Sequence, residues 1–141
     1  METCRDVMTK NPICALRKDT VVMVAQIMKE RDIGPVPVVS DTTSRTLIGI
    51  VTDRDLTLKV VATGHDPNNI LAEDVMTKDV VTCRADDDVQ TALDAMAKHQ
   101  LRRIPVVDEN DSLVGIIAQA DVATRMDEPE KTGEVVKEIS Q

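Results

Sequence analysis

The sequence predicts an α+β fold made of two copies of one small unit, related by a pseudo-twofold axis. The first observation is a repeat: the segment DVMTK at residues 6–10 recurs at 74–78, and an apolar strand with a central Pro at 36–39 recurs at 104–107. Both pairs share an offset of 68 residues (6 to 74), which falls to 66 (47 to 113) across a polar turn. A length change confined to a turn is expected of two copies of one folded unit.

The second observation is that the order of structural signals is the same in each copy. Acidic N-cap residues precede a helix whose apolar residues recur at i, i+3, i+4 and i+7. Two β-branched strands follow, and their continuous apolar runs predict burial on both faces. In the first copy we expect strands at 12–16, 36–40 and 47–52 and helices over Val21, Val24, Ala25 and Met28 and at 53–62. In the second copy we expect strands at 80–84, 104–108 and 113–118 and helices over Val89, Ala92, Leu93 and Met96 and at 119–126.

The predicted organisation is a first repeat at 1–66, including the N-terminal segment, a second repeat at 67–128 and a polar tail at 129–141. Each repeat alone, at about 60 residues, would bury little surface, so both are expected to share one module. The tail carries a weak apolar stripe of Val135, Val136 and Ile139 that could dock on its own body or on a partner.

Composition excludes several classes of function. A formal net charge of −8 argues against binding nucleic acid or an anionic membrane, which both need clustered Lys and Arg. No apolar run reaches the roughly 18 residues of a membrane span. The N-terminus lacks an apolar signal segment, and the three Cys lack CxxC or metal-ligand spacing. We therefore expect a cytoplasmic protein without a metal, whose thiols are structural or incidental.

One candidate site is the segment GIVTDRD at residues 49–55, where a strand is expected to meet a helix. Thr52 can cap the helix or bind a ligand oxygen, and Asp55 could accept hydrogen bonds from the two hydroxyls of a ribose. The alternative interpretation is structural, because Thr-x-x-Asp is close to a capping box. The equivalent segment at 115–121 keeps Gly and Asp but has Ala118 in place of Thr, which favours a ligand role for the retained pair.

A second candidate is the pair Arg102 and Arg103, directly before a predicted strand. Guanidinium groups bind phosphate oxygens bidentately, so this position suits a phosphate. The alternative is a pair of surface arginines that neutralise the acids at 86–88. The first copy has Gly34 and Pro35 at the equivalent place, without any charge.

Together these motifs resemble a tandem cystathionine-β-synthase (CBS) domain pair, also called a Bateman module, over about residues 5–126. The resemblance implies two β-α-β-β-α repeats packed sheet to sheet, and up to two clefts for adenosine-containing ligands (AMP, ADP, ATP, NAD or S-adenosylmethionine). The residues implied for the first site are Thr52, Arg54, Asp55, Val81, Thr82, Arg102, Arg103 and Ile104. Those implied for a second, weaker site are Ile13, Cys14, Gly34, Pro35, Val36 and Asp121.

The function expected from this resemblance is that of a sensor, which binds an adenine nucleotide and acts on a separate, unidentified partner protein through a change of shape. The alternative is a structural or interaction module that binds no nucleotide. A homodimer is expected in either case. The sequence shows no nucleophile–base pair at recognisable spacing, so we do not expect an enzyme.

Overall fold

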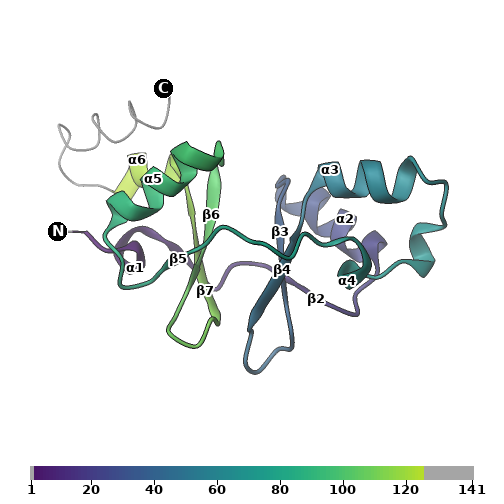
Figure 1. Ribbon diagram of the computed structural model, residues 1–141, viewed down its shortest axis with the longest axis horizontal. Coiled ribbons are helices and arrows are strands. Elements are labelled where there is room, and N and C mark those ends of the chain that lie inside the picture. The colour runs from purple at the N-terminus through teal and green to yellow at the C-terminus, as the bar shows by residue number, and fades with distance from the viewer. Residues whose placement is uncertain (1, 126–141) are drawn as a thin grey trace. The chain divides into compact units, whose positions relative to one another are not determined.

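The computed structural model describes residues 2–125 as a mixed α+β fold with two sheets and six α-helices in that range (Figure 1). The predicted α+β class is confirmed. Contacts divide the chain into two compact units: the residues up to 12 join those from 81 onward in one unit, and residues 13–80 form the other. The predicted tail, with its apolar stripe, lies outside the described residues.

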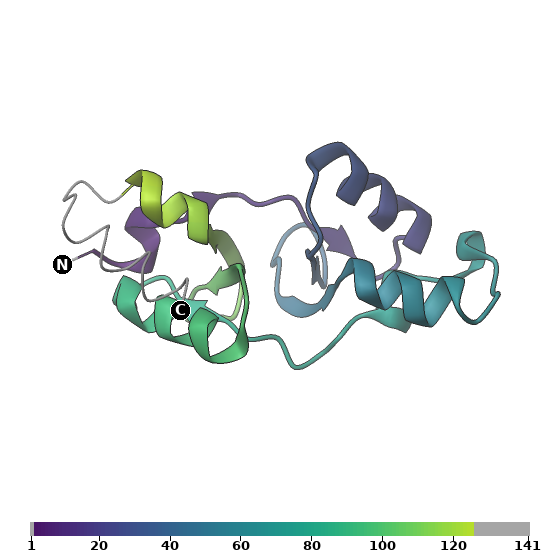
Figure 2. The ribbon, with the colours of Figure 1, turned by 90° about the horizontal axis from the view of Figure 1, so that it is seen from above.

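The unit of residues 13–80 is built on a three-stranded sheet in the order β2-β3-β4, with β2 parallel to β3 and β3 antiparallel to β4. Thr20 caps the first long helix by accepting a hydrogen bond from the Met23 N–H, as its N-cap position predicts. That helix, α2, lies beside α3 and its π-helical continuation (Figure 2). The elements are β2 (Ala15–Leu16), α2 (Val21–Arg31), β3 (Val36–Val39), β4 (Leu47–Val51), α3 (Asp53–Leu56), a π-helix (Thr57–Val61), a 3-10 helix (Pro67–Asn69) and α4 (Ala72–Val75).

The other unit has a four-stranded sheet in the order β1-β7-β6-β5, in which β5 is parallel to β6 and the other pairs are antiparallel. Asp88 caps its long helix by accepting the Gln90 N–H at 3.0 Å. The elements are α1 (Cys4–Val7), β1 (Thr9–Lys10), β5 (Cys83–Arg84), α5 (Val89–His99), β6 (Arg103–Val107), β7 (Leu113–Ala118) and α6 (Gln119–Arg125).

The two DVMTK segments each complete the sheet of the opposite copy. Thr9 in β1 pairs with Ile116 in β7, and at the equivalent place Thr77 bridges Ile50 in β4. The Thr77 bridge is made by two backbone hydrogen bonds of 2.8 and 2.9 Å. Each DVMTK segment therefore lies in the compact unit that is built mainly from the other sequence repeat, where the repeats are 1–66 and 67–128. The short helices α1 and α4, which begin these segments, were not predicted.

Glycine makes room for each exchanged segment. A Cβ on Gly49 would lie 2.5 Å from Sδ and 2.7 Å from Cγ of Met76, which is closer than real contacts allow. A Cβ on Gly115 would collide in the same way with the side chain of Met8, at 2.7 Å from its Cγ. The methionines of the two DVMTK segments thus lie directly on the glycine backbone of β7 and β4.

Burial confirms the strand and helix pattern in most places. Each unit has its own aliphatic core, and all four predicted residues of α5 are buried. Three details differ from the prediction. β4 and β7 alternate between buried and partly exposed positions, so they are not buried on both faces. In α2, Ala25 is exposed. The predicted helix at 53–62 changes from α to π geometry after Leu56.

Replacing Gly115 or Gly49 with Ala is expected to lower the free energy of unfolding by about 1–3 kcal/mol, because the added Cβ overpacks the methionine contact. Urea unfolding followed by circular dichroism would measure this. Gly34→Ala is the control, because its Cβ would meet only the Asp53 carboxylate, at 3.4 Å. Met8→Ala in the Gly115→Ala background should recover part of the loss. Equal stabilities for Gly34→Ala and Gly115→Ala would contradict this account.

Candidate functional site

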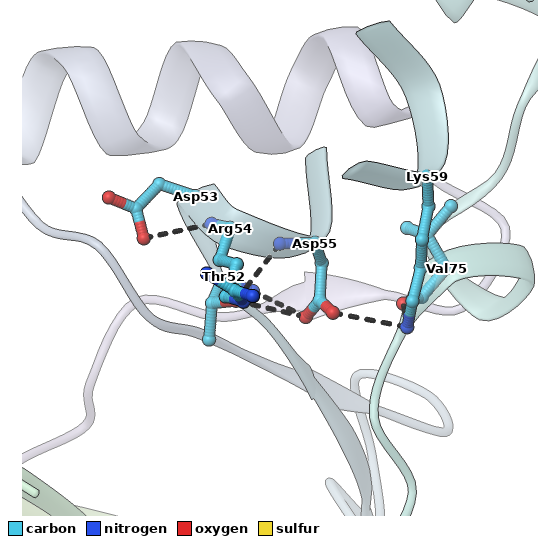
Figure 3. Close-up of polar contacts among 6 residues, drawn as sticks. All are labelled: Thr52, Asp53, Arg54, Asp55, Lys59 and Val75. Atoms are coloured by element: carbon cyan, nitrogen blue, oxygen red, sulfur yellow. Dashed lines mark hydrogen bonds and ion pairs between the residues drawn. The ribbon is translucent and has the colours of Figure 1, made fainter. Parts of the chain in front are cut away.

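The end of β4 and the start of α3 form a reciprocal capping box around Thr52 and Asp55 (Figure 3). The Thr52 hydroxyl oxygen accepts the Asp55 N–H at 3.1 Å. The Asp55 Oδ2 in turn accepts the Thr52 N–H at 2.9 Å and the Thr52 hydroxyl at 3.1 Å. The structural interpretation of this motif is therefore confirmed, with Asp in the position where Glu or Gln is usual.

Lys59 binds the other oxygen of the same carboxylate. Its ammonium lies 3.0 Å from Asp55 Oδ1 and also donates to the Val75 carbonyl oxygen at 2.8 Å (Figure 3). Asp55 is 9% exposed and is the buried charged residue of the described range, so the lysine supplies the compensating charge. Sequence reasoning missed Lys59, although an Asp followed four residues later by a Lys is a recognisable helix pair.

The second copy keeps half of this arrangement. Asp121 Oδ2 accepts the Ala118 N–H at 3.3 Å and the Thr9 hydroxyl at 3.2 Å. The retained Asp therefore caps the start of a helix in both copies, and the retained Gly makes room for a methionine in both. Their retention has a structural explanation, so it does not by itself favour a ligand role, contrary to the argument from sequence.

The Asp55 carboxylate has limited capacity for a further ligand. An ionised carboxylate accepts about four hydrogen bonds. Oδ2 already accepts two, both from Thr52, and Oδ1 is in an ion pair with Lys59. One acceptor position remains on Oδ1. A single ligand hydroxyl could be accepted there while these contacts stay, whereas a second hydroxyl must replace one of them.

Arg102 and Arg103 lie at the start of β6, where Arg102 is exposed and Arg103 is partly exposed. Within residues 2–125 neither guanidinium has an ion-pair partner. The acids at 86–88 have other contacts: Asp86 pairs with Arg5, Asp87 accepts the Arg84 N–H, and Asp88 caps α5. In the described range the two arginines form no ion pair with these acids, as the alternative interpretation would require for direct pairing.

The remaining predicted residues are divided between the units. The unit of residues 13–80 contains Thr52, Arg54 and Asp55, together with Ile13, Cys14, Gly34, Pro35 and Val36. The other unit contains Val81, Thr82, Arg102, Arg103, Ile104 and Asp121. Ile104 and Val36 are fully buried, and Ile13 is exposed. Burial raises the pKa of the Cys14 thiol, which keeps it protonated.

No group of three or more His, Cys, Asp or Glu side chains in residues 2–125 is placed to hold a metal ion. No helix in that part of the chain has the length and apolar character needed to cross a membrane.

Comparison with known proteins shows the family. The sequence model of the CBS domain matches residues 4–62 and 72–128, so this chain belongs to the CBS domain family and carries two copies of the domain. It is 38% identical over 128 residues to Hypoxic response protein 1 of Mycobacterium tuberculosis, covering 91% of this chain and 87% of that protein.

Solved structures agree with this assignment. A crystal structure of Hypoxic Response Protein I with two coordinated zinc ions has a TM-score of 0.79 and 37% identity, covering 89% of this chain and 99% of that one. The CBS domain pair of protein MJ0100, in complex with 5′-methylthioadenosine and S-adenosyl-L-methionine, has a TM-score of 0.71 and 29% identity, covering 88% and 94%.

An enzyme also contains a similar region. Inosine-5′-monophosphate dehydrogenase of Korarchaeum cryptofilum is 33% identical over 125 residues, which is 89% of this chain but 23% of that enzyme. Most of the enzyme therefore lies outside the matched region.

Asp55→Ala is expected to lower the free energy of unfolding by about 1–2 kcal/mol, because it removes the acceptor of the Thr52 N–H. Thermal or urea unfolding followed by circular dichroism would measure the loss. Asp53→Ala is the matched control, since Asp53 is exposed and accepts only the Arg54 N–H of the next residue. If both variants lost the same stability, the capping contacts of Asp55 would not be stabilising the junction.

Proposed function

We propose that this protein is a sensor that binds an adenosine-containing ligand and acts on a separate partner protein. The observation that carries the proposal is the nearly buried Asp55 carboxylate, which is fixed in position by Thr52 and Lys59 and keeps an acceptor position on Oδ1. A fixed anionic acceptor suits the hydroxyls of a ribose. Support also comes from the related CBS pair of MJ0100, which holds 5′-methylthioadenosine and S-adenosylmethionine.

In this proposal each group of the ligand has its own partner. Asp55 accepts ribose hydroxyls, and Arg102 or Arg103, which have no ion-pair partner in the described range, bind a phosphate when the ligand carries one. Adenine contacts aliphatic side chains such as that of the partly exposed Val81, because the chain has no aromatic residue to stack on it, whereas the predicted contact to Ile104 is not available because its side chain is fully buried. The ligand can be AMP, ADP, ATP, NAD or S-adenosylmethionine.

Binding both ribose hydroxyls requires one donor to leave the carboxylate. The Thr52 N–H is held by the backbone, whereas the Lys59 side chain is 46% exposed and can be solvated after it leaves. We therefore expect the second hydroxyl to displace Lys59 from Asp55. Because the same ammonium contacts the Val75 carbonyl, ligand binding would then change the contacts of α4.

The proposed action is regulatory. A partner that responds to the ligand must bind the two states of the sensor with different affinity, typically by about 1–3 kcal/mol. The dehydrogenase relative supports regulation over catalysis, because its matched region is a small part of the enzyme.

Asp55→Asn is expected to weaken the binding of adenosine compounds by roughly tenfold or more, since a lost hydrogen bond to a charged group is worth about 1.5–3 kcal/mol. Isothermal titration with 5′-methylthioadenosine and AMP would measure the affinity. Asp53→Asn makes the same change of charge two residues away and should leave affinity nearly unchanged. Unaltered affinity in a folded Asp55→Asn protein would exclude the ribose contact.

Arg103→Met is expected to weaken AMP binding by several-fold while leaving 5′-methylthioadenosine binding unchanged, because only AMP carries a phosphate for the guanidinium. Arg84→Met is the control, since Arg84 contacts the Asp108 carbonyl and Asp111 at the surface. The two ligands would be titrated side by side against each variant. A parallel loss of both affinities would show that Arg103 does not recognise phosphate.

A second candidate function is an interaction module that binds no nucleotide. It is favoured by an apolar groove of about 430 Å³ between α2 and the π-helix, lined among others by Val22, Ala25, Val60 and Val61. Val61, one of these lining residues, is 74% exposed. This function would replace the sensor if the folded protein bound no adenosine compound in the titrations and associated with a second copy in solution.

A further inference from the structure

Cys4 and Cys83 lie together in the core of one unit although they are 79 positions apart in the sequence. Cys4 begins α1 and is fully buried, and Cys83 begins β5 and is 4% exposed. Both belong to the same cluster of buried side chains. Neither residue has a role in the proposed nucleotide site.

Backbone contacts hold the two cysteine-bearing segments side by side. The Cys4 N–H donates to the Asp87 carbonyl at 2.8 Å, and the Arg5 N–H donates to the Ala85 carbonyl at 2.9 Å. The Arg5 guanidinium also pairs with Asp86. Helix α1 is therefore fixed along the chain that directly follows Cys83.

Within this frame each thiol donates to a carbonyl oxygen at 3.8 Å, that of Asp88 for Cys4 and that of Pro105 for Cys83. The neighbouring Cys83 thiol lowers the pKa of Cys4, while the Cys4 thiol and burial raise the pKa of Cys83. The first proton is therefore lost more easily from Cys4, which makes it the better nucleophile of the pair.

We propose that Cys4 and Cys83 are a modification site at which a small-molecule disulfide, such as glutathione disulfide, closes an intramolecular bond. The Cys4 thiolate attacks one sulfur of glutathione disulfide, forms a mixed disulfide and releases one glutathione thiolate, which takes up a proton. Cys83 then gives its proton to solvent and attacks the Cys4 sulfur, and the second glutathione leaves. Two protein thiols are oxidised, and one glutathione disulfide is reduced to two molecules of glutathione.

The bond would fasten the N-terminal segment covalently to its unit. In the reduced protein, residues 2–10 are held by hydrogen bonds, by the Met8–Gly115 contact and by β1 pairing, all of which can open locally. Because both sulfurs are buried, the oxidant reaches Cys4 only during such openings. Once formed, the bond prevents α1 from leaving its place beside β5 and keeps β1, which begins five residues after Cys4, close to its unit.

The test uses the full-length protein in glutathione buffers of increasing oxidised fraction, followed by alkylation of free thiols and peptide mapping by mass spectrometry. The expected product is one Cys4–Cys83 bond per chain, with Cys14 alkylated. Cys14→Ser should form the same bond. Cys83→Ser should lose it and carry a mixed disulfide between Cys4 and glutathione, whereas Cys4→Ser should lose it and leave Cys83 free for alkylation. A bond that includes Cys14, bonds between chains, or free Cys4 and Cys83 in fully oxidising buffer would overturn the proposal.

A second measurement, on the wild-type protein alone, tests the covalent attachment of the N-terminal segment to its unit. The oxidised wild-type protein should unfold at a higher temperature than the reduced protein, because the bond restricts the unfolded chain over a long loop. Dithiothreitol should reverse the shift. An unchanged or lower unfolding temperature, in protein shown by mapping to hold the bond, would overturn the fastening.

Discussion

The close packing of a methionine side chain on a glycine backbone is the contact on which both units depend. Met8 lies on Gly115 and Met76 lies on Gly49, at distances that leave no space for a Cβ. These two contacts hold the DVMTK segments against the sheets of the opposite copies. Three features depend on this position: the β1–β7 pairing, the Ile50–Thr77 bridge and the burial of Cys4 in the same cluster as Cys83.

In both copies, the Asp at the strand-to-helix junction caps the start of the helix. Any ligand role is additional to this structural role. Asp55 and Asp121 both accept the backbone N–H three residues earlier. Only Asp55 is also held by a lysine that reaches the Val75 carbonyl. One ammonium therefore connects the proposed ribose contact with α4, which leads directly into the exchanged segment. A ligand that displaces it would act on the packing of that segment.

The two copies differ most in the charge of the residues just before the strand that follows the long helix. Arg102 and Arg103 precede β6, whereas the equivalent Gly34 and Pro35 carry no charge. The acids at 86–88 contact Arg5, the Arg84 N–H and the start of α5, and the two guanidinium groups have no ion-pair partner in the described range. In a chain with a net charge of −8, such unpaired cations are suited to an anionic ligand.

The two copies, the long helices α2 and α5, the central strands and the Thr52–Asp55 capping box can be predicted from the sequence. These features rest on local signals, namely apolar periodicity, N-cap residues and turn composition, which act between residues close in the chain. The folded structure was needed to show which copy each DVMTK segment joins, that Arg5 pairs with Asp86, and that the Lys59 ammonium reaches the Val75 carbonyl. Those contacts join residues far apart in the chain, and both copies offer nearly the same edge strand. The pattern of residues alone, including the Met and the Gly that each copy repeats, therefore does not distinguish between the two pairings; the structure places Met8 on Gly115 and Met76 on Gly49.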